Sequence, residues 1–92
     1  MPVIISRRLP MEEGPQEVIV PKASKAVNFL NRGGEATVLF ESPAVHSDDE
    51  GIRVLQITEG AREAAKGAAY IGTAEFAGGQ RVMHAWEVSR AK

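Results

Sequence analysis

Short apolar runs divided by turn-forming residues are the feature that most constrains this chain. Each run stops at a proline, a glycine pair or a polar stretch, and the runs are rich in the β-branched residues that suit strands. Such spacing is typical of an all-β domain and not of a helical bundle. We therefore expect a mainly β fold, namely a small antiparallel sheet, a sandwich or a partly open barrel of about six to seven short strands.

Glycine pairs predict two tight hairpins. Residues 31–34 and 77–79 supply the positive φ angles that such turns require. The first turn joins segment 26–31 to a strand over 35–42, and the second joins strands 70–76 and 80–88. The remaining predicted strands are 3–9, 16–20 and 51–58.

Two segments also have helical features. A short helix is predicted near 59–67, because Thr58 suits a helix cap, alanines follow and Gly67 suits a helix end. Residues 22–30 stay open between strand and helix. Pro21 fits a first helical position, and an apolar stripe follows it at helical spacing.

The apolar residues of two predicted strands indicate how their faces are buried. Segment 51–58 has apolar residues on both faces, namely Ile52 and Val54 on one and Leu55 and Ile57 on the other. This pattern favours a central strand covered on each side. In the last strand Val82, His84, Trp86 and Val88 share one face, and Met83, Ala85 and Glu87 share the other. Because of its size, we expect Trp86 to lie in the core.

Size and charge exclude several classes of function. A chain of 92 residues has room for one domain, so we expect residues 1–92 to form a single unit. The net charge of −1 argues against nucleic-acid binding, and the lack of cysteine excludes disulfides, thiolate zinc sites and thiol nucleophiles. The apolar run 3–5 is too short for a secretory signal and the run 68–71 is too short for a membrane span, so we expect a cytoplasmic protein without membrane association.

Few residues suit chemistry. His46, Asp48 and Asp49 lack further nearby ligands for a metal site, and His84 is interpreted as a half-buried strand histidine. No serine stands in a nucleophile-elbow context, and neither glycine pair has the lysine of a phosphate loop. We therefore expect no enzyme activity, no catalytic residues, no cofactor and no metal.

An acidic, polar stretch over 44–51 predicts an exposed loop. Acidity is concentrated in the middle of the chain, where residues 35–63 carry seven acidic and two basic groups. Such a patch suits the steering of a partner. The candidate partner-binding residues are His46, Asp48, Asp49 and Glu50.

Several short segments carry a resemblance to a known family. The segments are Leu9-Pro10, Val20-Pro21-Lys22-Ala23, Val38-Leu39-Phe40-Glu41-Ser42-Pro43, residues 52–60, Tyr70-Ile71-Gly72-Thr73 and residues 82–87. In their order and spacing the chain resembles a family of small uncharacterised proteins of tailed bacteriophages and prophages, mainly of actinobacteria. The resemblance implies a strand after Pro21 and a phage origin, and it implies no activity.

These observations lead to two functional hypotheses. The first is a small non-structural phage protein that binds a host or phage protein, as in host takeover, growth inhibition or superinfection exclusion; a domain with exposed strand edges can accept a partner there. The alternative is a homo-oligomeric structural or accessory phage protein, because small domains often gain stability by burying a face against a copy.

Overall fold

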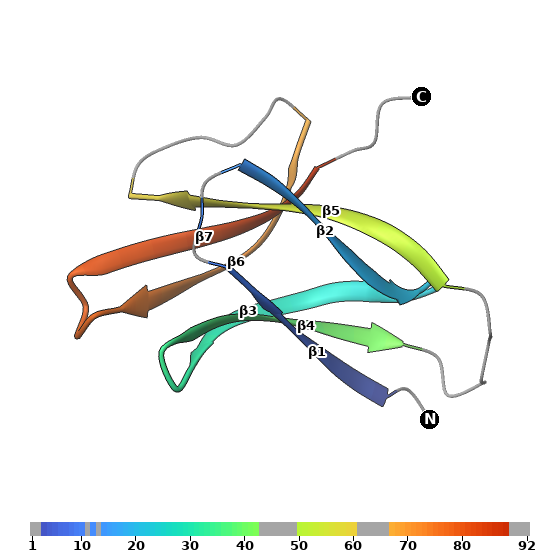
Figure 1. The fold of residues 1–92 in the computed structure, drawn as a ribbon, viewed down its shortest axis with the longest axis horizontal. Coiled ribbons are helices and arrows are strands. Elements are labelled where there is room, and N and C mark those ends of the chain that lie inside the picture. The colour runs from blue at the N-terminus through green and yellow to red at the C-terminus, as the bar shows by residue number, and fades with distance from the viewer. Residues whose placement is uncertain (1–2, 11, 13, 43–49, 61–66, 89–92) are drawn as a thin grey trace.

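The computed structural model describes residues 3–10, 12, 14–42, 50–60 and 67–88. These residues form seven strands, all paired antiparallel (Figure 1). The strands are β1 (Val3–Leu9), β2 (Gly14–Pro21), β3 (Lys25–Arg32), β4 (Glu35–Ser42), β5 (Glu50–Glu59), β6 (Ala69–Phe76) and β7 (Arg81–Val88).

The strands divide into two open sheets. The three-stranded sheet has the order β1-β4-β3, and the four-stranded sheet has the order β2-β5-β7-β6. The predicted mainly β fold is therefore confirmed in its sandwich form, and the alternative of a single sheet is not what forms. β5 lies between β2 and β7, so its predicted internal position is also confirmed.

Both predicted hairpins form. Gly33 and Gly34 have φ angles of 61° and 90° between β3 and β4. The Gly34 amide donates to the Asn31 side-chain oxygen at 2.7 Å, which closes the turn. The second hairpin joins β6 to β7 across residues 77–80, with a positive φ at Ala77 as well as at both glycines.

The two ambiguous segments have different outcomes. Residues 25–32 are strand β3, in which every residue except Val27, at a bulge, has a register partner on β4, and residues 22–24 precede the strand without being part of it. The helix predicted near 59–67 is not seen: Glu59 ends β5, Gly60 and Gly67 lie in turns, and residues 61–66 fall outside the described residues. Pairing of Glu59 with Met83 on β7 outweighs its weak local preference for a helix. The described part of the chain contains no helix long and apolar enough to cross a bilayer.

The core lies between the sheets and is built around three phenylalanines. Phe29, Phe40 and Phe76 are at most 3% exposed, and the Phe29 and Phe76 rings lie 6.1 Å apart. β7 directs the face with the smaller side chains into the core, where Met83 and Ala85 are buried. The expected core position of Trp86 is therefore wrong. Rings from the neighbouring strands already fill the space between the sheets, and Trp86 lies on the outside.

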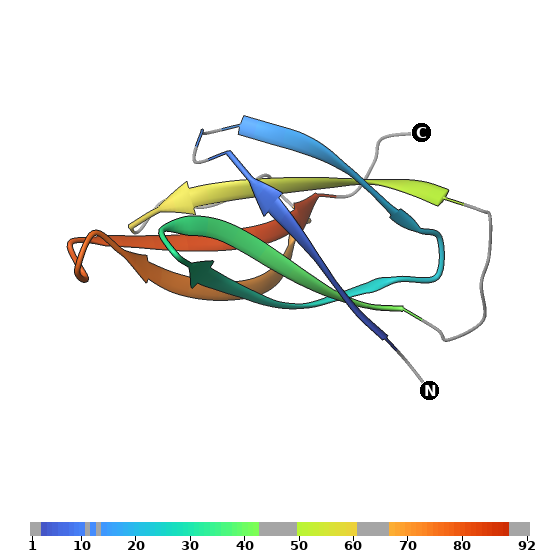
Figure 2. The same ribbon diagram turned by 60° about the horizontal axis from the view of Figure 1, so that its bottom comes forward.

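One side of the sandwich is closed by a backbone approach. β3 and β6, edge strands of different sheets, run close together (Figure 2). The Asn31 side-chain amide donates from Nδ2 to the Glu75 backbone carbonyl at 3.0 Å across this seam. A Cβ on Gly72 would lie 3.1 Å from the Phe29 amide nitrogen, so the lack of a side chain permits the approach.

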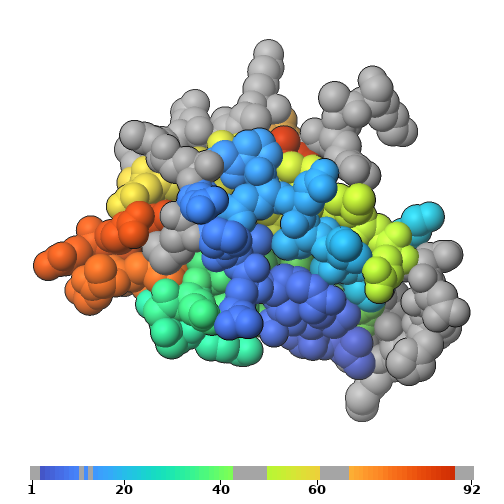
Figure 3. All heavy atoms as spheres, in the orientation of Figure 1, coloured from blue at the N-terminus to red at the C-terminus, as the bar shows by residue number. Residues whose placement is uncertain are grey.

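The opposite edges belong to β1 and β2, and atoms of the two strands meet on the surface (Figure 3). Arg7 on β1 donates from Nε to the Ile19 carbonyl of β2 at 3.0 Å. A charged side chain on one edge strand thus occupies a free acceptor on the other. Such a side chain hinders the addition of a further strand at either edge.

Candidate functional site

The outer surface of the four-stranded sheet is unusually apolar. We call the outward side chains of β2, β5, β7 and β6 the aromatic face. Alternation places them opposite the buried residues of the same strands. Its apolar members are Ile19, Ile52, Val54, Tyr70, Val82, Trp86 and Val88. Tyr70 is 57% exposed and Ile19 is 54% exposed, so large apolar side chains of this face meet solvent.

Two aromatic side chains meet on the face, Trp86 on the inner strand β7 and Tyr70 on the edge strand β6. Tyr70 on β6 is the register partner of Trp86 on β7, and their rings meet edge to face with centroids 5.3 Å apart. The Trp86 indole N–H donates to the Thr58 hydroxyl on β5 at 2.9 Å. Three adjacent strands therefore hold the aromatic pair in one orientation.

A chain of hydrogen bonds runs from Tyr70 to the turn after β5. The Tyr70 hydroxyl bonds to the Thr73 hydroxyl, which lies 2.8 Å from His84 Nδ1. His84 Nε2 lies 2.7 Å from the Gly60 carbonyl oxygen. A carbonyl oxygen can only accept, so Nε2 carries a proton and Nδ1 of the neutral ring accepts from Thr73. Thr73 in turn accepts from Tyr70.

This chain of hydrogen bonds holds side chains in place and lacks the arrangement that would activate Thr73 as a nucleophile. Thr73 and His84 have the spacing of a nucleophile and its base, but a backbone carbonyl stands where catalytic triads have a carboxylate. The Thr73 oxygen is also engaged by Tyr70. The chain of bonds fixes the exposed Tyr70 ring on the face.

A β-bulge in β6 makes this chain of bonds possible. Tyr70 and Thr73 are three positions apart, a spacing that puts side chains of a regular strand on opposite faces. The register shifts between Tyr70 and Gly72, so both Tyr70 and Thr73 point outward. Gly72 therefore occupies the inward position opposite Ala85.

Acidic groups border the apolar centre. Glu17 on edge strand β2, Glu75 on edge strand β6 and Glu50 at the start of β5 occupy outward, exposed positions. Within the described strands of this sheet, no lysine or arginine occupies an outward position. The face therefore combines an apolar centre with a negative border.

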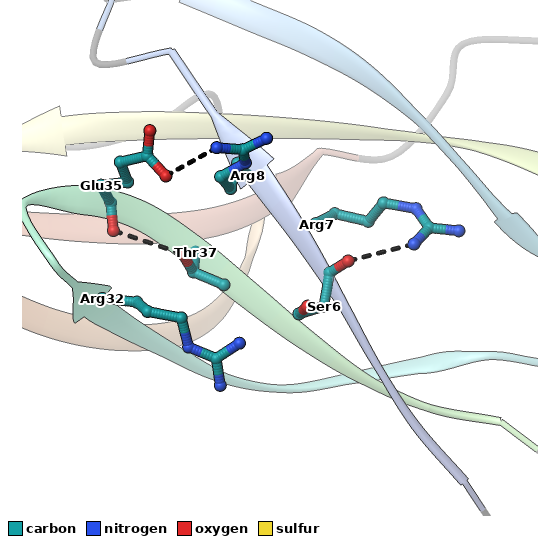
Figure 4. Close-up of a pocket in the computed structure, with 6 residues that line it drawn as sticks. All are labelled: Ser6, Arg7, Arg8, Arg32, Glu35 and Thr37. Atoms are coloured by element: carbon teal, nitrogen blue, oxygen red, sulfur yellow. Dashed lines mark hydrogen bonds and ion pairs between the residues drawn. The ribbon is translucent and has the colours of Figure 1, made fainter.

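A depression of about 440 Å³ lies on the other sheet, and its lining includes Arg7, Arg8 and Arg32 (Figure 4). Figure 4 shows their guanidinium groups directed to different sides. Arg8 is paired with Glu35 at 2.9 Å, and this hydrogen bond raises the pKa of Arg8. Arg7 donates to two backbone carbonyls. The three cations do not converge, so the depression lacks the geometry of an anion site.

The predicted partner-binding residues have two outcomes. His46, Asp48 and Asp49 lie outside the described residues. Glu50 is exposed on the border of the aromatic face. The described residues contain no group of three or more histidines and carboxylates that could hold a metal ion.

Sequence reasoning missed the aromatic face, although it left a signal. Segment 51–58 is apolar on both sides, which we interpreted as cover on both sides, and in the last strand we expected Trp86 to lie in the core. A domain of this size forms two layers, so one apolar side of such a strand has no layer to cover it. Ile52 and Val82 are accordingly exposed.

Comparisons with known proteins found no matching family model, no matching curated protein and no matching solved structure. The resemblance to a phage family stays a prediction from the motifs.

Proposed function

We propose that this chain is a small non-structural bacteriophage protein that acts as a protein-interaction module. A host or phage protein docks on the aromatic face in this proposal. The observation that carries it is the exposure of Ile19, Ile52, Tyr70 and Val82 on one side of one sheet. Contiguous exposed apolar residues with a polar border are typical of protein-binding surfaces.

The dimensions of the face suit such a role. Four strands of at least eight residues span roughly 500 Å² in projection, at about 4.8 Å between strands and 3.4 Å per residue. The smaller specific interfaces bury about 600 Å² on each partner. The tyrosine and tryptophan held on the face are residue types that dominate binding energy at interfaces.

The strand edges support docking on a face more than addition of a strand. Arg7 occupies the Ile19 carbonyl at the open side of the sandwich. At the other side the two edge strands, β3 and β6, lie against each other. Both observations weigh against the hypothesis that a partner adds a strand at an exposed edge.

The test is co-purification from an actinobacterial host that expresses the tagged chain. The face variant carries Ile52→Ser and Tyr70→Ser, and the control carries Ile4→Ser and Val27→Ser, which remove similarly exposed apolar side chains from the other sheet. We expect a stoichiometric partner with wild type and control that is lost with the face variant. A partner retained by the face variant, or no partner at all, would refute the proposal. A chain that associates only with itself would favour the homo-oligomeric alternative.

A further inference from the structure

The charge of the aromatic face is one-sided and unpaired. Among the described residues, the carboxylates of Glu17, Glu50 and Glu75 have no hydrogen bond and no ion pair. They stand on three parts of the border: one edge strand, the other edge strand and the start of β5. A partner that covers the apolar centre therefore brings its own charges close to these carboxylates.

The ring N–H and hydroxyl groups beside the aromatic pair are one-sided in the same sense. The protons of Trp86, His84, Thr73 and Tyr70 are all donated within the face or to the Gly60 carbonyl. The Tyr70 oxygen keeps a free lone pair while its proton is engaged. Together with the three carboxylates, the exposed tyrosine offers a partner acceptors and not donors.

A second copy of this chain fits such a surface poorly. Two aromatic faces packed together would bring carboxylates near carboxylates and acceptors near acceptors, and the described strands of this sheet place no lysine or arginine on the face of either copy. Like charges placed opposite each other at an interface are unfavourable, and acceptors left without donors add to that cost.

We infer that the aromatic face binds a basic, amphipathic segment of a partner protein, in which lysine or arginine side chains flank aliphatic ones. The aliphatic groups pack on the ring pair and on Ile52, and the cations reach the border carboxylates and the Tyr70 oxygen. This inference rests on the proposed function and names the chemistry of its partner. Charge complementarity of this kind sets partner choice and speeds association.

The experiment uses the 92-residue chain and three short fluorescein-labelled peptides. The peptides share alternating aliphatic residues and carry lysine, glutamate or serine between them. Binding is measured by fluorescence anisotropy at low and high salt. The test variant is Glu17→Lys with Glu75→Lys. Its matched control is Glu12→Lys with Glu41→Lys, which changes the net charge equally at exposed positions away from the face.

We expect the lysine peptide to bind most tightly and to lose affinity at high salt. The test variant should weaken this binding about tenfold, and the control should change it by less than about twofold. Tyr70→Phe keeps the ring and removes the acceptor, so it should weaken binding about threefold to tenfold.

Four results would overturn the inference: equal or tighter binding of the glutamate or serine peptide, no binding of the lysine peptide, indifference of lysine-peptide binding to the test variant, or face-dependent dimers in sedimentation. The proposed function fails separately, through the loss of a face-dependent partner in the host experiment.

Discussion

Replacing Gly72 by alanine should destabilise the fold, because β6 and β3 meet at this residue without room for a side chain. The new Cβ would lie 3.1 Å from the Phe29 amide nitrogen and 3.3 Å from the Phe29 Cβ, where ordinary contacts begin at 3.4 Å. Backbone and a buried ring must therefore shift by a few tenths of an ångström. Overpacking of this kind costs about 1–3 kcal/mol.

A smaller effect opposes this cost. Alanine restricts the unfolded chain more than glycine does, which stabilises the folded state by about 0.4–1 kcal/mol. The net loss should be about 1–2 kcal/mol, which corresponds to a fall in Tm of about 5–15 °C for a domain of this size. Urea unfolding followed by circular dichroism measures the free energy, and thermal scans measure Tm.

Gly51→Ala provides the matched control. Its new Cβ would also be tight, at 3.2 Å, but the neighbour is the Cγ of the flexible Lys22 side chain, which can move aside. This variant should be as stable as wild type or up to about 1 kcal/mol more stable. Equal stability of the Gly72 and Gly51 variants would show that β6 does not approach β3 this closely.

Three further predictions follow from the side-chain contacts. Arg53→Met should cost about 1–3 kcal/mol in urea unfolding, because Glu87 loses its partner at 2.8 Å and two carbonyls lose a donor; adding Glu87→Leu should restore part of the loss, and no restoration would contradict the pairing. Arg8→Ala should leave the urea midpoint nearly unchanged, since the two side chains of its ion pair with Glu35 are 73% and 55% exposed; a clear fall in the midpoint would mean that the pair is shielded from solvent. Nitrogen NMR at about pH 8 should find the proton of neutral His84 on Nε2, and a proton on Nδ1 would contradict the bond from Thr73.

Much of the fold could be predicted from local chemistry. Prolines and glycine pairs mark where strands end, and the strand over Val3–Leu9 has the predicted bounds. The helix near 59–67 was predicted from capping and alanine content, which are weak where a strand can pair instead. For Glu59, pairing with Met83 decides the outcome.

The candidate site was harder to predict, because it joins residues that are far apart along the chain. Glu50 was expected to bind a partner, and it lies on the border of the aromatic face. Tyr70, Thr73 and His84 meet only through a bulge that alternation does not reveal. Gly60 enters through its carbonyl, which no side-chain motif indicates.

The sequence by itself determined where the strands and turns lie, because strand spacing and positive φ angles are local properties. It also determined that Met83 and Trp86 point to opposite faces of β7. Only the tertiary structure decided which face is buried, since two apolar faces satisfy the same alternation. Phenylalanines from β3, β4 and β6 fill the space between the sheets, so β7 buries Met83 and leaves Trp86 outside beside Tyr70.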